Sequence, residues 1–189
     1  GMAQAYYASC QTDKMEAAIQ RGLEINPDDP NLLAAFGNWL AYSGRWEAGD
    51  ALTQRALAIE PQRHKKWWWM GPAKSHYFRG ENEQAYQVFM KSFNERNWLS
   101  HLQLAYTLPY LGRVSEAEAA IAELQKLLPG FTVEHALEFY KMFCFGDEFM
   151  LKMKQALIYA GLPSRGDSNN LSDIKPLAAK TIPVNGVDI

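Results

Sequence analysis

The sequence has only two cysteines, no long apolar run and no motif of a secretory leader. Cys10 and Cys144 are far apart and show neither a disulfide framework nor a zinc-site spacing, so we expect unpaired thiols in a reducing, cytoplasmic setting. No stretch approaches the roughly 20 apolar residues that span a bilayer. The first ten residues lack the basic and apolar regions of a signal peptide, and we expect no membrane partner.

The sequence also lacks an excess of charge of either sign. Its 19 basic and 21 acidic side chains give a formal charge of -2, so nucleic acid is not an expected partner. Because 48% of the 189 residues are hydrophobic, the chain can bury a sizeable core.

Motifs of the common catalytic and metal sites are missing as well. There is no glycine-rich phosphate loop, no G-x-S-x-G elbow and no H-E-x-x-H pair. The four histidines, His64, His76, His101 and His135, show no paired-ligand spacing. Cys144 lies in an apolar context typical of an inert thiol. We therefore expect no catalytic residues, no metal and no cofactor, and a protein that is not an enzyme.

Internal repeats are the strongest feature that is present. Leu23 recurs as Leu57, and Pro27 as Pro61, at a spacing of 34 residues. The segments "RGENEQAYQVFMKSF" and "LGRVSEAEAAIAELQKLLPG" continue the pattern with small changes of spacing. In the last of these, Ser115 and a glutamate three residues later predict a capping box at a helix start. Each unit is predicted to be a pair of antiparallel helices.

The period and the pattern resemble those of the tetratricopeptide repeat (TPR). The pattern residues in the best-matching unit are Leu33, Phe36, Gly37, Leu40, Gly49, Thr53, Ala56 and Pro61. Small residues such as Gly37 and Gly49 predict a close approach of the two helices. The resemblance implies an all-α fold, a right-handed superhelix of TPR-like helical hairpins.

Three parts are predicted along the chain. Residues 1–129 hold about four TPR-like units, the first of them truncated. Gly1 ahead of Met2 looks like a scar of tag removal, so we expect a piece of a longer protein. Residues 130–161 are predicted to form two helices that cap the array. Residues 162–189 are rich in Ser, Asn, Asp, Gly and Pro and are predicted to be an extended or disordered tail.

The order of features over about residues 10–163 is similar to the C-terminal TPR region of certain bacterial signalling proteins. In these proteins the N-terminal part is an adenylate or guanylate cyclase domain or a winged-helix regulator. The resemblance implies a regulatory or scaffolding part, and the chain has no cyclase core that would carry the activity itself. The expected function is therefore protein–protein interaction.

The resemblance also indicates where a partner binds, because the first helix of each TPR unit lines the concave surface. The residues that fall at these places are Asn38, Tyr42, Trp67, Met70, Lys74, Tyr77, Phe78, Leu99, Leu102, Tyr106 and Tyr110. All but Leu99 are our predicted partner-binding residues. Such an aromatic groove suits an apolar or aromatic-bearing peptide, a helix, or a domain of the same parent chain.

Other interpretations remain open at this stage. The groove could be filled by the C-terminal helices or by the tail, since exposed apolar patches rarely stay uncovered. The aromatic residues could instead lie in a homodimer interface of a dimerisation scaffold. They could also line the pocket of a small-molecule sensor domain.

The segment "KKWWWM" is the irregular part of the pattern. Its register predicts Trp69 as a core residue and Trp67 as a groove residue, and it leaves Trp68 without an assigned place. Because Pro72 follows closely, we favour a kinked helix over 66–79. The alternative is a short helix that starts at Pro72, with the tryptophans in a loop or a separate turn.

Overall fold

The protein is all-α over the residues that the structure, a computed structural model, describes, namely 2–62 and 65–164. This part of the chain forms ten α-helices and two short 3-10 helices and contains no strand. The elements are α1 (Met2–Ala8), α2 (Thr12–Ile25), α3 (Pro30–Tyr42), α4 (Trp46–Ile59), η1 (Lys66–Trp69), α5 (Met70–Phe78), α6 (Asn82–Ser92), α7 (Trp98–Thr107), η2 (Leu108–Leu111), α8 (Val114–Leu127), α9 (Val133–Lys141) and α10 (Asp147–Tyr159).

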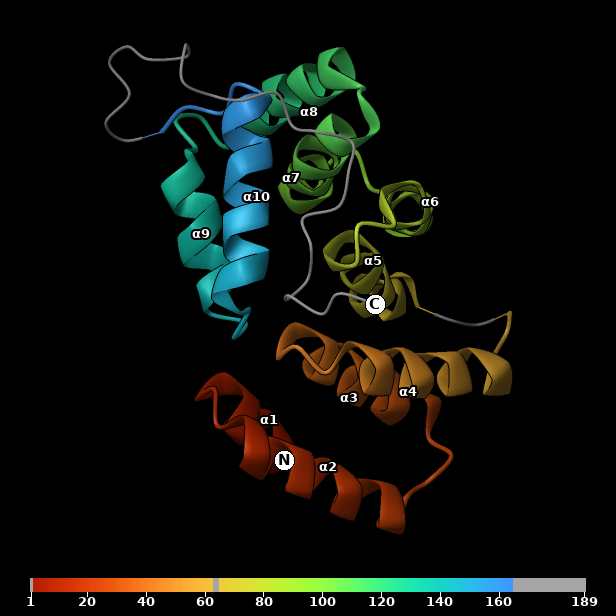
Figure 1. The fold of residues 1–189 in the computed structure, drawn as a ribbon. Coiled ribbons are helices and arrows are strands. Elements are labelled where there is room, and N and C mark those ends of the chain that lie inside the picture. The colour runs from red at the N-terminus through yellow and green to blue at the C-terminus, as the bar shows by residue number, and fades with distance from the viewer. Residues whose placement is uncertain (1, 63–64, 165–189) are drawn as a thin grey trace, which may run out of the picture.

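Consecutive helices pack as hairpins, α1 with α2, α3 with α4, α5 with α6 and α7 with α8. Figure 1 shows these hairpins following one another, with α9 and α10 beside α7 and the turn between them pointing toward α1. No described helix is both long enough and apolar enough to cross a membrane. Residues 165–189, most of the predicted tail, lie outside the described residues, as does His64.

The same turn joins the two helices of each hairpin. Gly44, Gly80 and Gly112 lie at its left-handed position, with φ of 87°, 80° and 71°. Cys10 takes this position in the first hairpin, with φ of 52°. In all four turns this residue donates its N–H to the carbonyl three positions earlier, and the next residue donates to the carbonyl five positions earlier. The spacing of the glycines along the chain therefore follows from a repeated turn.

The expected close approach within the second hairpin is confirmed. A Cβ atom on Gly49 would lie 2.5 Å from the carbonyl oxygen of Gly37, and one on Gly37 would lie 2.7 Å from that of Gly49. Glycine at both places lets the backbones of α3 and α4 meet. In the fourth hairpin the predicted capping box is wrong, because α8 begins at Val114 and its N-cap residue, Arg113, makes no side-chain cap.

The tryptophan segment differs from its predicted register. Trp68 is fully buried against Leu33, Ala34 and Ala56, whereas Trp67 is 38% exposed and Trp69 is half-buried. The prediction of Trp69 as the core residue is wrong. The reason is that η1 is a 3-10 helix, whose side chains follow a period of three rather than 3.6.

The favoured single kinked helix is wrong too. The α-helix begins at Met70, and Pro72 lies in its first turn, where a missing N–H breaks no hydrogen bond within the helix. The tryptophans occupy a separate 3-10 turn, as in the alternative, but the helix starts two residues before Pro72.

The two cysteines form a disulfide, so the expectation of unpaired thiols is wrong. Their Cα atoms lie 5.5 Å apart, although 134 positions separate them in the sequence. Cys10 lies in the turn between α1 and α2, and Cys144 in the turn between α9 and α10. Only the packing of the terminal hairpins brings these turns together. The cysteines therefore no longer argue for a reducing setting.

Candidate functional site

Five predicted partner-binding residues meet around one group of rings, which we call the aromatic cluster. Its members are Tyr42, Tyr77, Tyr106, Tyr110, Tyr140, Phe145 and Phe149. The ring of Tyr77 lies 4.7 Å from that of Tyr106 and 5.8 Å from that of Tyr110. The Lys74 ammonium lies 5.0 Å from the centre of the Tyr42 ring. The aromatic cluster thus receives its tyrosine rings from α3, α5, α7 and η2.

The C-terminal helix pair contributes the remaining rings of the cluster. Phe145 lies 4.9 Å from Tyr42, and Phe149 lies 5.6 Å from Tyr77. The Tyr106 and Tyr140 hydroxyl groups are 3.1 Å apart, within hydrogen-bonding distance. The region from α9 to α10 therefore covers the predicted groove residues, which was one of the interpretations left open by the sequence.

Two further predicted residues belong to the hydrophobic core next to the cluster. Leu102 is fully buried in it. Phe78 stacks on Trp46 with ring centres 4.8 Å apart, and Trp46 in turn lies 6.1 Å from Phe149. Leu99 packs on the same core and is half-buried.

Asn38, Trp67 and Met70 make their contacts elsewhere. Asn38 donates from Nδ2 to the Trp67 carbonyl oxygen at 3.1 Å and accepts at Oδ1 from the Gly71 N–H at 2.7 Å. It therefore satisfies the backbone where η1 meets α5. The Met70 sulfur lies 3.6 Å from Nε2 of Gln103. Trp67 is the most exposed of the predicted site residues, at 38%, and its ring contacts that of Trp68 edge-on.

Lys74 is a buried cation at the edge of the aromatic cluster. It is 3% exposed, and its ammonium faces the rings of Tyr42, Tyr140 and Phe89 at 5.0, 5.8 and 5.9 Å. The described residues make no hydrogen bond or ion pair with this ammonium. Burial lowers the pKa of Lys74 to about 7, because water is removed from the charged form.

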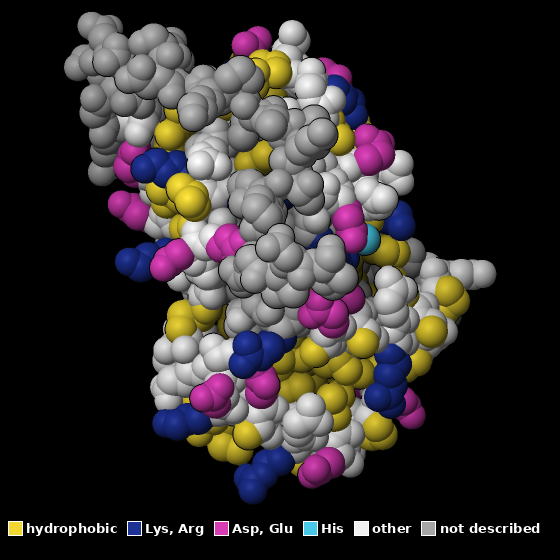
Figure 2. All heavy atoms as spheres, in the orientation of Figure 1, with side chains coloured by type: hydrophobic (Ala, Val, Ile, Leu, Met, Phe, Trp, Pro, Cys, Tyr) yellow, Lys and Arg dark blue, Asp and Glu magenta, His cyan; other side chains and the backbone are white. Residues whose placement is uncertain are grey.

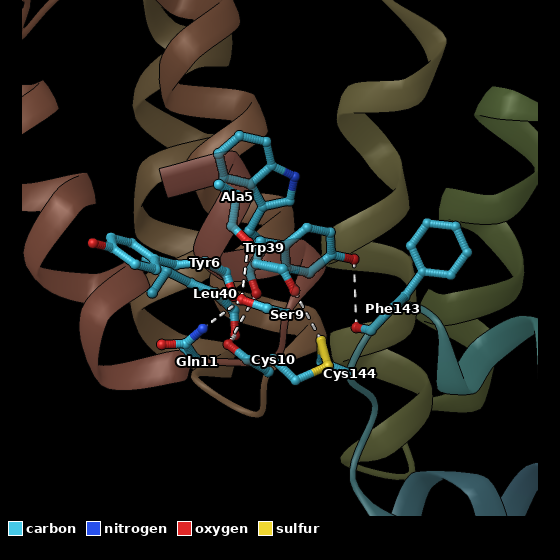
Figure 3. Close-up of a disulfide and its surroundings, with 11 residues drawn as sticks. Ala5, Tyr6, Ser9, Cys10, Gln11, Trp39, Leu40, Phe143 and Cys144 are labelled. Atoms are coloured by element: carbon cyan, nitrogen blue, oxygen red, sulfur yellow. Dashed lines mark hydrogen bonds between the residues drawn. A yellow bond between two sulfur atoms is a disulfide. The ribbon is translucent and has the colours of Figure 1, made fainter. Parts of the chain in front are cut away.

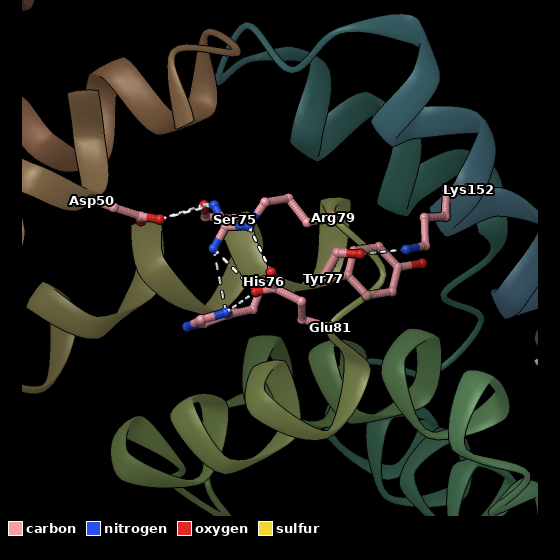
Figure 4. Close-up of polar contacts among 7 residues, drawn as sticks. All are labelled: Asp50, Ser75, His76, Tyr77, Arg79, Glu81 and Lys152. Atoms are coloured by element: carbon pink, nitrogen blue, oxygen red, sulfur yellow. Dashed lines mark hydrogen bonds and ion pairs between the residues drawn. The ribbon is translucent and has the colours of Figure 1, made fainter. Parts of the chain in front are cut away.

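Lys152 of α10 is a second buried cation on the same cluster. Its ammonium donates to the Tyr77 carbonyl oxygen and lies 4.4 Å from the Tyr77 ring centre and 4.9 Å from that of Tyr110 (Figure 4). Burial lowers the pKa of Lys152 to about 8, although the nearby Glu148 carboxylate acts in the opposite direction. The covered surface is thus aromatic, with positive charge at its edges.

A polar network joins α4 to the hairpin of α5 and α6 (Figure 4). Arg79 pairs with Asp50 at 3.0 Å and with Glu81 at 3.2 Å, and His76 lies 2.5 Å from Glu81. Ser75 donates its hydroxyl proton to Asp50 at 2.8 Å. The Asp50 oxygen that accepts this proton is also paired with Arg79, so the network links α4 to α5 by charge-assisted hydrogen bonds. No group of side chains suited to a metal ion occurs among the described residues.

An apolar pocket at the outer edge of α9 was missed by the sequence analysis. Its volume is about 530 Å³, and it is lined by Trp98, Leu128, Pro129, Gly130, Phe131, His135, Glu138, Phe139 and Met142. The Trp98 ring lies 4.8 Å from Phe139, edge-on, and 5.5 Å from Phe131. The segment between α8 and α9 contains a single aromatic residue, Phe131, so the sequence contained little indication of the pocket. It spans the predicted boundary at residues 129 and 130 between the fourth repeat unit and the capping helices.

No protein-family model matches the chain, and no curated protein matches it closely enough to count as similar. The resemblance to TPR proteins and to cyclase-associated repeat regions therefore stays a prediction from sequence patterns.

Proposed function

We propose that this protein is a non-enzymatic interaction module that binds a helix bearing aromatic side chains. The supporting observation is that Phe145 and Phe149 already lie among the rings that α3, α5 and α7 present, with their own ring centres 4.4 Å apart. Phe149 lies in the first turn of α10 and Phe145 in the turn just before it, so the two rings occupy the surface as the start of a partner helix would. A partner with the same spacing of two aromatic residues is the occupant that the geometry supports best.

The binding energy would come from a few buried anchors. Burying a phenylalanine side chain contributes about 1.5 to 3 kcal/mol, and well-oriented aromatic pairs add about 0.5 to 1.5 kcal/mol. Lys74 has no carboxylate partner among the described residues, so an acidic residue beside the partner's aromatic pair would complement it. The preferred partner is therefore an aromatic helix with negative charge.

The finer architecture belongs to the same proposal. Four successive hairpins with one shared turn are in keeping with a right-handed superhelix of TPR-like units, whose first helices line the binding side. In Figure 2, hydrophobic side chains gather over α3 and α4, with lysine or arginine side chains on both sides. A regulatory or scaffolding role in a cytoplasmic bacterial signalling protein, with the partner in the parent chain or in another protein, completes the proposal.

The test uses a synthetic peptide of residues 142–160, which contains α10 and the turn before it, and fluorescence anisotropy as the measurement. Phe149→Ala should vacate part of the surface and let the peptide bind more tightly than it binds the unaltered chain. Leu151→Ala is the matched control, because Leu151 lies on α10 and is 56% exposed. A peptide with alanine in place of both phenylalanines should not bind. Equal binding of the two peptides, or none to any variant, would refute the proposal.

A second candidate function is the binding of a small aromatic molecule in the pocket beside Trp98. Its volume of about 530 Å³ is in the range of ligand sites, and His135 and Glu138 supply polar groups at its wall. Thermal shift with indole-like compounds would test this function. A shift that persists in Trp98→Ala would argue against the pocket as the site.

A further inference from the structure

The disulfide joins the first and last helix pairs at their turns. Figure 3 shows the bond between Cys10 and Cys144, with Gln11 on the side of Cys10 and Phe143 on the side of Cys144. Both cysteines have a left-handed backbone, with φ of 52° and 60°. The cross-link therefore joins two turns that lie between helices, and neither cysteine belongs to a helix.

Access to the disulfide is one-sided. Cys10 is exposed, whereas Cys144 is half-buried. A hollow of about 510 Å³ lies at the Cys10 side, lined by Cys10, Gln11, Thr12, Asp13 and Lys14. A thiolate attacks a disulfide sulfur directly, and the other sulfur leaves. Because the hollow borders Cys10 and this residue is the more exposed of the two, we expect a thiol to attack the Cys10 sulfur and Cys144 to be the leaving group.

A hydrogen-bond acceptor lies next to the sulfur of Cys144, the proposed leaving group. Sγ of Cys144 lies 3.1 Å from the carbonyl oxygen of Tyr7. Once the bond is broken and the Cys144 thiolate has taken a proton from water, its S–H can donate to that carbonyl. The reduced form thus finds a hydrogen-bond acceptor in place.

Besides the disulfide, the contacts between these turns in the described residues are one side-chain hydrogen bond and hydrophobic packing, in which Phe143 and Cys144 lie against the cluster of Tyr7 and Leu40. The Tyr7 hydroxyl donates to the Phe143 carbonyl oxygen at 3.4 Å, a long hydrogen bond. Tyr42 of α3 meets Phe143 edge-on at 6.3 Å, and Phe145 at 4.9 Å. Without the covalent bond, the α9–α10 turn would be retained at this end mainly by these rings.

We propose that the Cys10–Cys144 disulfide is a thiol–disulfide exchange site whose reduction releases the region from α9 to α10 from the aromatic cluster. The co-reactant is a small thiol, or the dithiol of a protein reductase. Its thiolate forms a mixed disulfide with Cys10 and expels the Cys144 thiolate, and a second thiolate then attacks the thiol's sulfur and leaves Cys10 reduced. The release step rests on the interaction surface proposed above, whereas the exchange step does not.

The exchange step is tested by incubating the native protein with glutathione and mapping adducts by mass spectrometry. The chain has two cysteines, so every adduct is assigned to one of two sites. We expect the glutathione adduct on Cys10 without denaturant. An adduct that forms first on Cys144, or a disulfide that exchanges only in denaturant, would overturn the proposal. In single variants, the thiol left by Cys144→Ser should react with maleimide faster than the thiol left by Cys10→Ser.

The release step is tested by hydrogen exchange of α10 and by binding of the 142–160 peptide. Reduction should accelerate hydrogen exchange in α10. It should also raise the affinity for the peptide on the order of 10²-fold, because the region from α9 to α10 competes for the same surface and has a lower effective concentration there once the disulfide is broken. The double variant Cys10→Ser/Cys144→Ser should behave like the reduced chain in any buffer. Unchanged exchange in α10 would overturn the release step. Faster exchange without peptide binding would instead refute the proposed function and leave the exchange site standing.

Discussion

Asn38 of α3 and Gly71 of α5 are joined by a hydrogen bond of 2.7 Å from the glycine N–H to the asparagine Oδ1. The approach is so close that a Cβ atom on Gly71 would lie 2.5 Å from this oxygen. The same amide donates to the Trp67 carbonyl oxygen. One buried side chain thus supplies a partner to the Gly71 N–H and a second donor to the Trp67 carbonyl, which also accepts the Met70 N–H, and it links the second helix hairpin to the third.

Replacing Asn38 should destabilise the protein without unfolding it. Asn38→Ala leaves the Gly71 N–H and the Trp67 carbonyl without this partner, which should cost about 1 to 3 kcal/mol. Urea denaturation followed by circular dichroism measures the loss. Asn31→Ala, at an exposed place at the start of the same helix, is the control. Equal midpoints for the two variants would contradict the structural role of Asn38.

Gly49→Ala should destabilise the second hairpin by overpacking. The added Cβ would meet the Gly37 carbonyl oxygen at 2.5 Å, so α3 and α4 must separate. We expect a loss of about 1 to 3 kcal/mol, measured by thermal and urea denaturation. Ala51→Ser, exposed on the same helix, should leave both midpoints nearly unchanged. A neutral Gly49→Ala would mean that the helices are not in close contact.

The three tryptophans should differ in their contribution to stability. Trp68→Ala removes a fully buried ring and should cost about 3 to 5 kcal/mol. Trp67→Ala removes a ring that is 38% exposed and should cost clearly less. Denaturant midpoints of the single variants decide the order. If Trp69→Ala proves the most damaging, the burial of Trp68 is wrong.

Lys74 should make stability depend on pH. Its pKa is about 7 in the folded state, below that of an unfolded lysine, so the unfolded chain binds more protons above pH 7. Stability should therefore rise from pH 7 toward pH 10, by up to about 1.4 kcal/mol per pH unit. Lys152, whose pKa is about 8, adds to the upper part of this range. Lys74→Met should flatten the profile measured by urea denaturation between pH 7 and 8, and an unchanged slope there would refute the assignment.

Removing the disulfide should lower stability, because it closes a loop between residues 134 positions apart. The double variant Cys10→Ser/Cys144→Ser should lose about 2 to 5 kcal/mol relative to the oxidised chain. Reductant should lower the midpoint of the unaltered chain to a similar value and leave the double variant unaffected. A midpoint that reductant does not change would show that the cross-link does not constrain the unfolded chain.

Much of the local structure was predictable from the sequence. The helix pairs follow from apolar periodicity, and the turns at Gly80 and Gly112 follow from residues that adopt a left-handed backbone easily. The approach of Gly37 to Gly49 was also expected from residue size. Cys10 shows the limit of this reasoning, since it takes the same turn position as the glycines without any local indication.

The candidate site was less predictable, because its contacts join segments far apart in the chain. The register of the first helices pointed to Tyr42, Tyr77 and Tyr106; Tyr77 and Tyr106 meet directly, and Tyr42 joins the same cluster through Phe145. It could not show that Phe145 and Phe149 would cover them, nor that Asn38 would serve the backbone at Gly71. The assignment of the ten predicted site residues to partner binding stays a prediction.

The sequence by itself determined the all-α class and the succession of hairpins, because these depend on hydrogen bonds and side-chain spacings within about one turn of helix. Tertiary structure alone decided which tryptophan is buried, what covers the aromatic cluster, and that Cys10 meets Cys144. These outcomes depend on how whole helices stack. The contact between Cys10 and Cys144, which are 134 positions apart, depends on how all the helices between them pack. No local sequence pattern predicts it.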